Sequence, residues 1–309
     1  MIDARVLAWL LDPAEPAVRA RTLVDLLARA DADVREARAA APERGSAARL
    51  LADADLGARG QALYRPKYGA PFHRLIALAE MGVPASHPRA GALLELCMDE
   101  FLGPAAGPLA DPEVCLTGNL TRAALLMGRG DDPRVAGALD WLVATQLADG
   151  GWHCWPDKVP HGTLDAWEGL GAFAAVPPDR RPPAMRAAIL RGVEFFLANG
   201  LGMRDPYAPW RRIHVPRHYY YDVLVGLELA TSLGDPRDPR LAPALAWLEG
   251  KRGADGRWHI DAQHPDVAEG ADYTPRDAAA TRPLVVEESG ASRWATLAAL
   301  RVLRRVGRA

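Results

Sequence analysis

A block of sequence that occurs twice constrains the fold of this chain more than any other feature. Asp132-Pro133-Arg134 opens VAGALDWLVATQLADGGW, and Asp238-Pro239-Arg240 opens LAPALAWLEGKRGADGRW. In both blocks the proline suits the first turn of a helix, and the aspartate before it can cap that helix. The Asp-Gly turn supplies the positive φ that ends the helix. His87-Pro88-Arg89 opens a third, more diverged block. Repeated helical units predict a fold in which similar units pack side by side.

A second helix of each unit is rich in Leu and Ala over most of its surface, which is typical of a helix buried between neighbours. Six such segments begin at Ala17, Phe72, Cys115, His161, Tyr219 and Ser292. The partner helices carry an apolar stripe and a charged face. They include 133–147 and 239–250, and short helices near 2–11 and 43–52 complete that set. An extra helix is expected from Asp31, and no alternating strand pattern is visible.

Six inner and six outer helices that alternate along the chain predict an all-α fold, an (α/α)6 toroid. We expect one domain over residues 1–309, with long connecting loops at about 199–216 and 259–288. Loops of that length are usually either functional lids or disordered segments.

Composition narrows the class of protein and its partners. The net charge of -2 gives no reason to expect nucleic acid as a partner. Three cysteines exclude a full disulfide framework and favour a reducing compartment. No apolar run approaches the roughly 20 residues of a membrane span, and the first residues lack the features of a signal peptide. We therefore expect a cytoplasmic protein.

Two motifs carry a family resemblance. QLADGGW and RGADGRW resemble the QW-type repeats of squalene and other terpene cyclases. The alternation of inner and outer helices is similar to those enzymes and to the β subunits of protein prenyltransferases, over nearly the whole chain. The resemblance implies an enzyme with an apolar substrate, such as an isoprenoid, in a central cavity. However, the Asp-x-Asp-Asp acid of the class II cyclases and the aspartate-rich diphosphate motif of class I are both absent, and Asp131-Asp132 is better explained as a helix cap.

The comparison with prenyltransferases also suggests a zinc site. That family holds zinc with an Asp-x-Cys at the start of one inner helix and a His at the start of the next. Here Glu113 and Cys115 resemble the first motif and His161 the second, whereas the basic residues that bind diphosphate are missing. Cys154 would make the set Cys, Cys, His, similar to that of the zinc-containing lanthionine cyclases. Asp111 is another possible ligand. The alternative is that both cysteines are small buried residues and His161 is a hydrogen-bonded helix-start residue.

A second group of residues is expected at the mouth where the inner helices begin. Its candidates for acid, base or catalytic roles are Asp222, Asp165, His218 and Tyr221. The side chains expected to line the pocket are His73, Tyr68, Tyr219, Tyr220 and Trp167. A desolvated aspartate can act as an acid or base, and aromatic faces can stabilise a cation. The alternative is that the tyrosines simply pack the mouth of the barrel.

Two arginines on the first inner helix, Arg19 and Arg21, are expected to pair with carboxylates. Glu168, Glu228 and Glu287 are the candidates, in a structural role.

The sequence leaves three functions open. The first is a cyclase-like or transferase-like enzyme acting on an apolar small molecule, with or without zinc. The second is a toroid that binds a lipid or peptide without catalysis. The third is a zinc-dependent cyclase or transferase that handles thiols on peptides.

Overall fold

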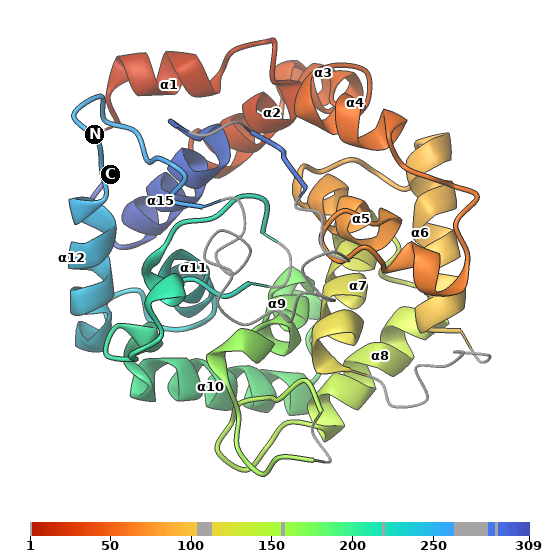
Figure 1. The fold of residues 1–309 in the computed structure, drawn as a ribbon. Helices are drawn as coiled ribbons and strands as arrows, with labels where there is room; N and C mark the ends of the chain where they lie inside the picture. Colours follow the sequence, from red (N-terminus) through yellow and green to blue (C-terminus); the bar gives the residue numbers. More distant parts are fainter. Residues whose placement is uncertain (1, 104–112, 156–157, 218–219, 263–283, 288–289) are drawn as a thin grey trace.

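The helices alternate between an inner and an outer ring in the computed structural model (Figure 1). The structure describes residues 2–103, 113–155, 158–217, 220–262, 284–287 and 290–309. The inner helices are α2 (Pro16–Asp25), α5 (Pro71–Glu80), α7 (Val114–Leu126), α9 (Glu168–Ala175), α11 (Val223–Leu233) and α15 (Arg293–Arg305). The outer helices are α1 (Ala4–Leu10), α4 (Gly45–Ala52), α6 (Pro88–Phe101), α8 (Pro133–Ala144), α10 (Pro183–Ala198) and α12 (Ala242–Gly250). The predicted toroid is confirmed, as is the extra helix, α3 (Ala32–Ala40).

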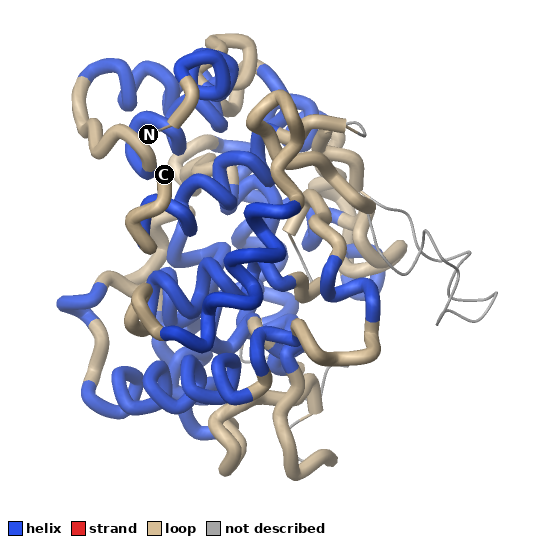
Figure 2. The backbone as a smooth tube through the Cα atoms, turned by 90° about the vertical axis from the view of Figure 1, so that its left-hand side faces the viewer, coloured by secondary structure: helices blue, strands red, loops and turns tan. Residues whose placement is uncertain are grey.

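The ring closes where its last helix meets its first. Helix α15 packs against both α11 and α2, and the chain ends lie close together in both views (Figures 1 and 2). Arg293 forms an ion pair with Asp12 at 3.0 Å, and Arg301 pairs with Asp25 at 3.1 Å. Side-chain pairing across about 280 residues of sequence therefore joins the two ends of the ring.

The two repeat tryptophans occupy equivalent places in the core. Trp152 donates from Nε1 to the carbonyl of Leu142 at 2.9 Å, and Trp258 donates to the carbonyl of Leu248 at 2.7 Å. Each acceptor lies ten residues earlier, near the end of an outer helix, and both rings are fully buried. Gly150 and Gly256 have φ of +88° and +78°, as the Asp-Gly turns predict. The repeated motif thus folds the chain back from each outer helix onto the core.

The arginine of each repeat block ties one outer helix to the preceding one. Arg134 at the start of α8 pairs with Glu95 and Asp99 on α6. Arg240, before α12, pairs with Glu194 on α10. In the third block Arg89 donates to carbonyls at the end of α4. The repeat therefore specifies contacts around the outer ring as well as helix starts.

Inner helices α7 and α9 approach each other unusually closely at Gly118. A Cβ atom at this position would lie 2.6 Å from the backbone carbonyl of Glu168. Both Gly118 and Glu168 are buried, so a larger residue at position 118 would have to push the two helices apart.

Two predicted helix starts are wrong. The segment from His161 enters a turn and a short 3-10 helix (Leu164–Ala166), and α9 begins only at Glu168. The cause is local: Thr163 bridges Trp152, and Gly162 donates to Asp149 at 2.7 Å, which holds the chain extended here. The segment from Tyr219 begins its helix at Val223, because Asp222 caps α11.

The two long loops can be followed only in part. Residues 199–216 form two 3-10 turns (Gly200–Gly202 and Ala208–Arg211) and bury Leu201, Ile213 and His214. Of the second loop, residues 263–283 lie outside the described residues. In the described part of the chain, no strand is formed and no helix is long and apolar enough to cross a bilayer.

Candidate functional site

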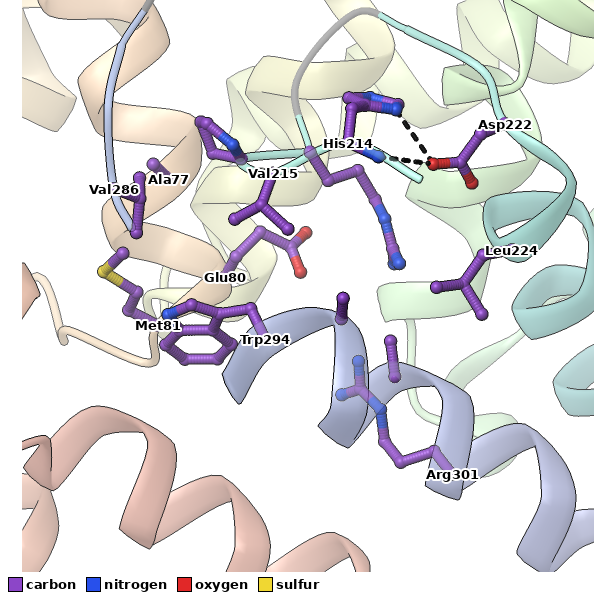
Figure 3. A pocket seen from close by; sticks show the side chains of 14 residues that line it. Ala77, Glu80, Met81, His214, Val215, Asp222, Leu224, Val286, Trp294 and Arg301 are labelled. Carbon is purple, nitrogen blue, oxygen red and sulfur yellow. Dashed lines mark hydrogen bonds and ion pairs between the residues drawn. The ribbon is translucent and has the colours of Figure 1, made fainter. Parts of the chain in front are cut away.

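A cavity lies beside the first turns of α11 and α15 and the last turn of α5 (Figure 3). Its walls are mostly apolar and include Met81, Val215, Leu224, Val286 and Trp294. It leaves about 50 Å³ for the centres of water-sized molecules, and about 530 Å³ of space between atoms when the part open to solvent is included. The cavity therefore suits a small apolar group, or one end of a longer molecule.

A buried His–Asp pair forms the polar side of this cavity. Nδ1 of His214 lies 2.8 Å from Oδ2 of Asp222, and the two side chains are 0% and 3% exposed (Figure 3). Asp222 is fixed in turn, because it accepts from the backbone N–H of Val225 at 2.8 Å and of His214 at 3.3 Å. A carboxylate beside the imidazole can stabilise its protonated form, so His214 is a candidate general base.

Charged side chains form the floor of the cavity. Glu80, Arg217 and Arg301 line it, and Glu228 beneath pairs with both arginines, at 2.8 Å in the case of Arg301. Burial alone would raise the pKa of Glu228, but the positive charges of Arg217 and Arg301 outweigh it and lower this pKa to about 2. Burial lowers the pKa of Arg217 and Arg301, but their acidic neighbours, Glu228 first among them, more than reverse this effect. The network of Glu228 with Arg217 and Arg301 is therefore ionised.

The predicted pairing of Arg21 needs a correction. Its partner is Asp25, on the same helix, at 3.2 Å. Of the three predicted carboxylates, Glu228 pairs with Arg217 and Arg301 instead, and Glu287 accepts from Ser292 and Arg293. Asp25 lies one helical turn from Arg21, where side chains on the same face of a helix meet.

Several predicted pocket residues meet through ring contacts. His73 packs against Tyr68 at 5.4 Å between ring centroids, Tyr68 packs against Tyr220 at 5.7 Å, and Tyr220 packs against His214 at 6.0 Å. These aromatics form a layer behind the His214–Asp222 pair. His218 and Tyr219 lie outside the described residues.

Three other predicted site residues have partners away from this cavity. Tyr221 is fully buried and donates to the carbonyl of Leu201 at 3.1 Å, and burial raises its pKa well above the ordinary value. Asp165 accepts from Nε1 of Trp210 at 2.8 Å. Trp167 is buried with the guanidinium of Arg122 over its ring, 5.2 Å from the centroid. None of these three lines the cavity beside α11 and α15.

The predicted zinc ligands do not fit a metal ion in this form of the protein. Cys115 and Cys154 are joined by a disulfide, with a Cα–Cα distance of 5.5 Å, so neither offers a thiolate. Glu113 accepts from Nε1 of Trp155 at 3.3 Å, and His161 is exposed. No group of three His, Cys, Asp or Glu side chains suited to a metal occurs among residues that the structure describes. Asp111 lies outside them.

The disulfide also bears on the predicted compartment. Cys97 is the remaining cysteine, and burial raises the pKa of its thiol. Three cysteines exclude a structure in which every cysteine forms a disulfide, but they allow a single disulfide. Because disulfides persist mainly in oxidising compartments, the bridge weakens the reason given for a cytoplasmic location, which remains a prediction.

The most informative residue of the site was missed from the sequence. His214 lies in the long loop 199–216 and next to no recognisable motif. A signal was present, since this loop ends shortly before Asp222, the cap of α11, and carries a histidine and three arginines among apolar residues. Only the fold of the loop shows which of its polar residues turns inward.

Comparisons with solved structures find two variants of the type II terpene cyclase MstE from Scytonema, each in complex with geranylgeranyl dihydroxybenzoate. One is 16% identical over 95% of this chain and 87% of its own, with a TM-score of 0.44. The other is 14% identical over 99% of both chains, with the same TM-score. A protein from Actinoplanes is 18% identical over 85% of this chain and 99% of its own, with a TM-score of 0.30. No family model and no curated protein matches the sequence. The toroid fold rests on the helix order and contacts of the chain itself.

Proposed function

We propose that the protein is an enzyme that binds an apolar molecule in the cavity beside α11 and α15 and moves a proton on it with His214. One observation carries this proposal: a buried His214–Asp222 pair lies on the wall of a cavity that is otherwise apolar. Buried titratable groups with a specific charged partner in a cleft are candidates for catalysis. The isoprenoid class suggested by the sequence fits the apolar walls.

The floor of the cavity indicates which protons His214 could move. An unactivated C–H bond is far too weak an acid for imidazole, whereas a C–H bond beside a carbonyl can be broken by a general base. A carbonyl oxygen facing Arg217 and Arg301 would become an enolate oxygen stabilised by positive charge. We therefore propose an apolar ketone or aldehyde as the substrate class.

The proposed step balances without a metal or a second substrate. Nε2 of His214 takes a proton from the carbon beside the carbonyl. The electron pair of that C–H bond forms the C=C bond of an enolate, and the π pair of the carbonyl moves to its oxygen. Asp222 stabilises the imidazolium that results. The imidazolium then returns the proton to the same carbon or, in a conjugated substrate, to another carbon, which gives an isomer.

Deuterium exchange tests the proposal. Geranylacetone, an uncharged isoprenoid ketone, would be incubated with the protein in D₂O and its mass followed against a buffer blank. We expect enzyme-dependent gain of deuterium beside the carbonyl, reduced at least about 100-fold in His214→Gln and Asp222→Asn. Asn keeps the helix cap at position 222. Asp165→Asn is the matched control and should exchange as wild type does.

A non-catalytic toroid that binds a lipid or peptide is the second candidate. It is favoured by one observation: ion pairs close the barrel beneath the cavity, which limits the room for a large substrate. Geranylacetone that binds but gains no deuterium would support this candidate and contradict catalysis.

Zinc binding by Cys115 and Cys154 would require the reduced form of the protein. Reduction of the Cys115–Cys154 bridge would free two thiols, and the thiol-handling function suggested by the sequence depends on them. Elemental analysis of the reduced protein after zinc is offered, with Cys115→Ala alongside, measures this. About one zinc per wild-type chain, lost in the variant, would support a zinc site.

A further inference from the structure

A second cavity lies at the opposite ends of the inner helices from the His214–Asp222 pair. Along α15, Trp294 lines the first cavity, Arg301 lines both, and Arg305 lines only the second. Helix α11 shows the same order, with Leu224 in the first cavity and Ser232 in the second. Since a helix rises about 1.5 Å per residue, Trp294 and Arg305 are about 16 Å apart along the axis. The second cavity is therefore a separate opening, where the inner helices end.

Positive charge dominates the lining of this second cavity. Its arginines are Arg21, Arg122, Arg217, Arg301 and Arg305, and its two carboxylates are Glu80 and Glu228. Both carboxylates are already paired, Glu80 with Arg122 and Glu228 with Arg217 and Arg301. Asp25 adds one more negative charge, shared between Arg21 and Arg301. In the described part of the chain, five guanidinium groups thus face three carboxylates.

The other nearby carboxyl group does not restore the balance. Glu168 is fully buried, and burial raises its pKa well above the ordinary value, which disfavours its charged form. Burial also lowers the pKa of Arg21 and of Arg122, against the opposing effect of their acidic neighbours. With five guanidinium groups facing three carboxylates among the described residues, the positive charge of the lining is incompletely compensated. An incompletely paired charge that is partly removed from water carries a desolvation cost, which an anion would relieve.

The end of α2 supplies part of the missing negative charge. Arg304 donates to the carbonyl of Asp25, the last residue of α2, at 2.8 Å, and Arg305 donates to the carbonyl of Glu228, within α11, at 3.4 Å. The carbonyl groups at the end of a helix together carry about half a negative charge, which acts within the last turn. These carbonyl groups orient the two arginines without filling the cavity. The cavity has an empty volume of about 690 Å³, which includes the part open to solvent.

We propose that this cavity binds a phosphate group, as a soluble phosphate ester or as the headgroup of a phospholipid. Arginine is suited to this ligand because its planar guanidinium donates two parallel hydrogen bonds to phosphate oxygens. The arginines come from α2, α7, α15 and the loop before α11, so an anion in the cavity meets donors from several sides.

Calorimetric titration with pyrophosphate tests the proposal. Arg305→Gln and Arg21→Gln remove one charge each from α15 and α2. Arg304→Gln is the matched control, since Arg304 is exposed, precedes Arg305 and does not line the cavity. We expect wild type and Arg304→Gln to bind alike, with affinity falling as NaCl screens the charges. Each lining variant should bind about tenfold more weakly, the loss of one charge-assisted hydrogen bond. Melting temperatures without ligand would show that each variant is folded.

Vesicle flotation separates the two sources of phosphate. Binding to phosphatidylcholine vesicles that contain phosphatidic acid, lost in Arg305→Gln, would identify a lipid headgroup. Pyrophosphate binding without vesicle binding would identify a soluble ester. The proposal is overturned if millimolar pyrophosphate gives no binding and the vesicles give none. It is equally overturned if Arg304→Gln weakens binding as much as Arg305→Gln does.

Discussion

Replacement of Glu228 by Gln tests the ion-pair network that closes the barrel between the two cavities. Glu228 is a buried carboxylate on α11 and pairs with Arg217 and Arg301. Gln has nearly the same shape but no charge, so the variant removes the electrostatic interaction and leaves the packing in place. It also leaves two buried guanidinium groups without their shared partner.

The size of the effect follows from the pKa. Burial works against ionisation of Glu228, but the neighbouring arginines lower its pKa from the ordinary 4.5 to about 2. Since one pKa unit corresponds to about 1.4 kcal/mol, the ionised group contributes about 3.4 kcal/mol to folding. Breaking a buried ion pair by removing one partner costs about 3 to 5 kcal/mol. We therefore expect Glu228→Gln to lower the free energy of unfolding by about 3 to 4 kcal/mol at pH 7.

The difference between wild type and variant should depend on pH. The folded-state pKa of Glu228 lies below its unfolded value, so its contribution is complete above about pH 4.5 and is lost as the pH falls toward 2. At pH 3 the difference should have shrunk to about 1.4 kcal/mol. Urea unfolding followed by circular dichroism at both pH values would measure it.

Glu168→Gln is the matched control. Glu168 is also a buried inner-helix carboxyl group, and it accepts from Nδ2 of Asn119 at 3.4 Å. Because burial raises its pKa well above the ordinary value, the folded protein keeps it protonated, and wild type loses stability as the pH rises above the unfolded pKa. Gln resembles the protonated acid, so the variant should change stability by less than about 1 kcal/mol at low pH and favour the fold at higher pH. Equal losses in the two variants, or a Glu228→Gln loss that does not vary with pH, would refute the reasoning.

Three further changes test the rest of the fold. Reduction of the Cys115–Cys154 bridge, which closes 39 residues of sequence, should lower the free energy of unfolding by about 4 kcal/mol, measured by urea unfolding with and without a phosphine reductant; no change would mean that the bridge is absent in solution. Trp258→Phe should cost about 2 to 4 kcal/mol, because it opens a void and removes the hydrogen bond from the indole to the carbonyl of Leu248. Half-buried Trp247→Phe should cost much less. Thermal unfolding compares the two variants, and similar losses would contradict the repeat geometry. Gly118→Ala should destabilise the protein by about 1 to 3 kcal/mol, because the new methyl group clashes with Glu168. Gly137→Ala is the control: Gly137 is an exposed residue of α8 with no atom within 4 Å of the added Cβ, so this change should stabilise by about 0.5 to 1 kcal/mol. Urea midpoints that move in the same direction in both variants would argue against the close α7–α9 contact.

The repeat made the fold predictable. Trp152 and Trp258 recur with the same spacing from an Asp-Gly turn, and the structure gives them the same hydrogen bond to the end of an outer helix. Each turn and each tryptophan hydrogen bond forms within one repeat unit, so the structure of a unit can be predicted from its own sequence. Repeated units of this kind then pack side by side. The helix start at His161 was wrong because the Trp152–Thr163 bridge holds that segment extended. Helical periodicity does not report such a contact with an earlier segment.

The site was less predictable because its residues come from different parts of the chain. Asp222 was identified as a candidate acid or base, but its partner His214 lies in a loop without periodicity, and the loop fold alone brings them to 2.8 Å. Cys115 and Cys154 were expected to approach each other, and they do, as a disulfide. Spacing predicted their nearness but could not distinguish bonding to each other from bonding to a metal.

Binding of geranylacetone to two neighbouring valine variants tests the functional site most directly, because it requires no knowledge of the reaction. Val286 lines the cavity and is buried, whereas Val285 beside it is 57% exposed. If the cavity beside α11 and α15 is the site, titration calorimetry should show binding to wild type and Val285→Phe, and binding at least about tenfold weaker to Val286→Phe, whose ring would occupy the cavity. Absence of binding to wild type, or equal binding to both variants, would contradict the account.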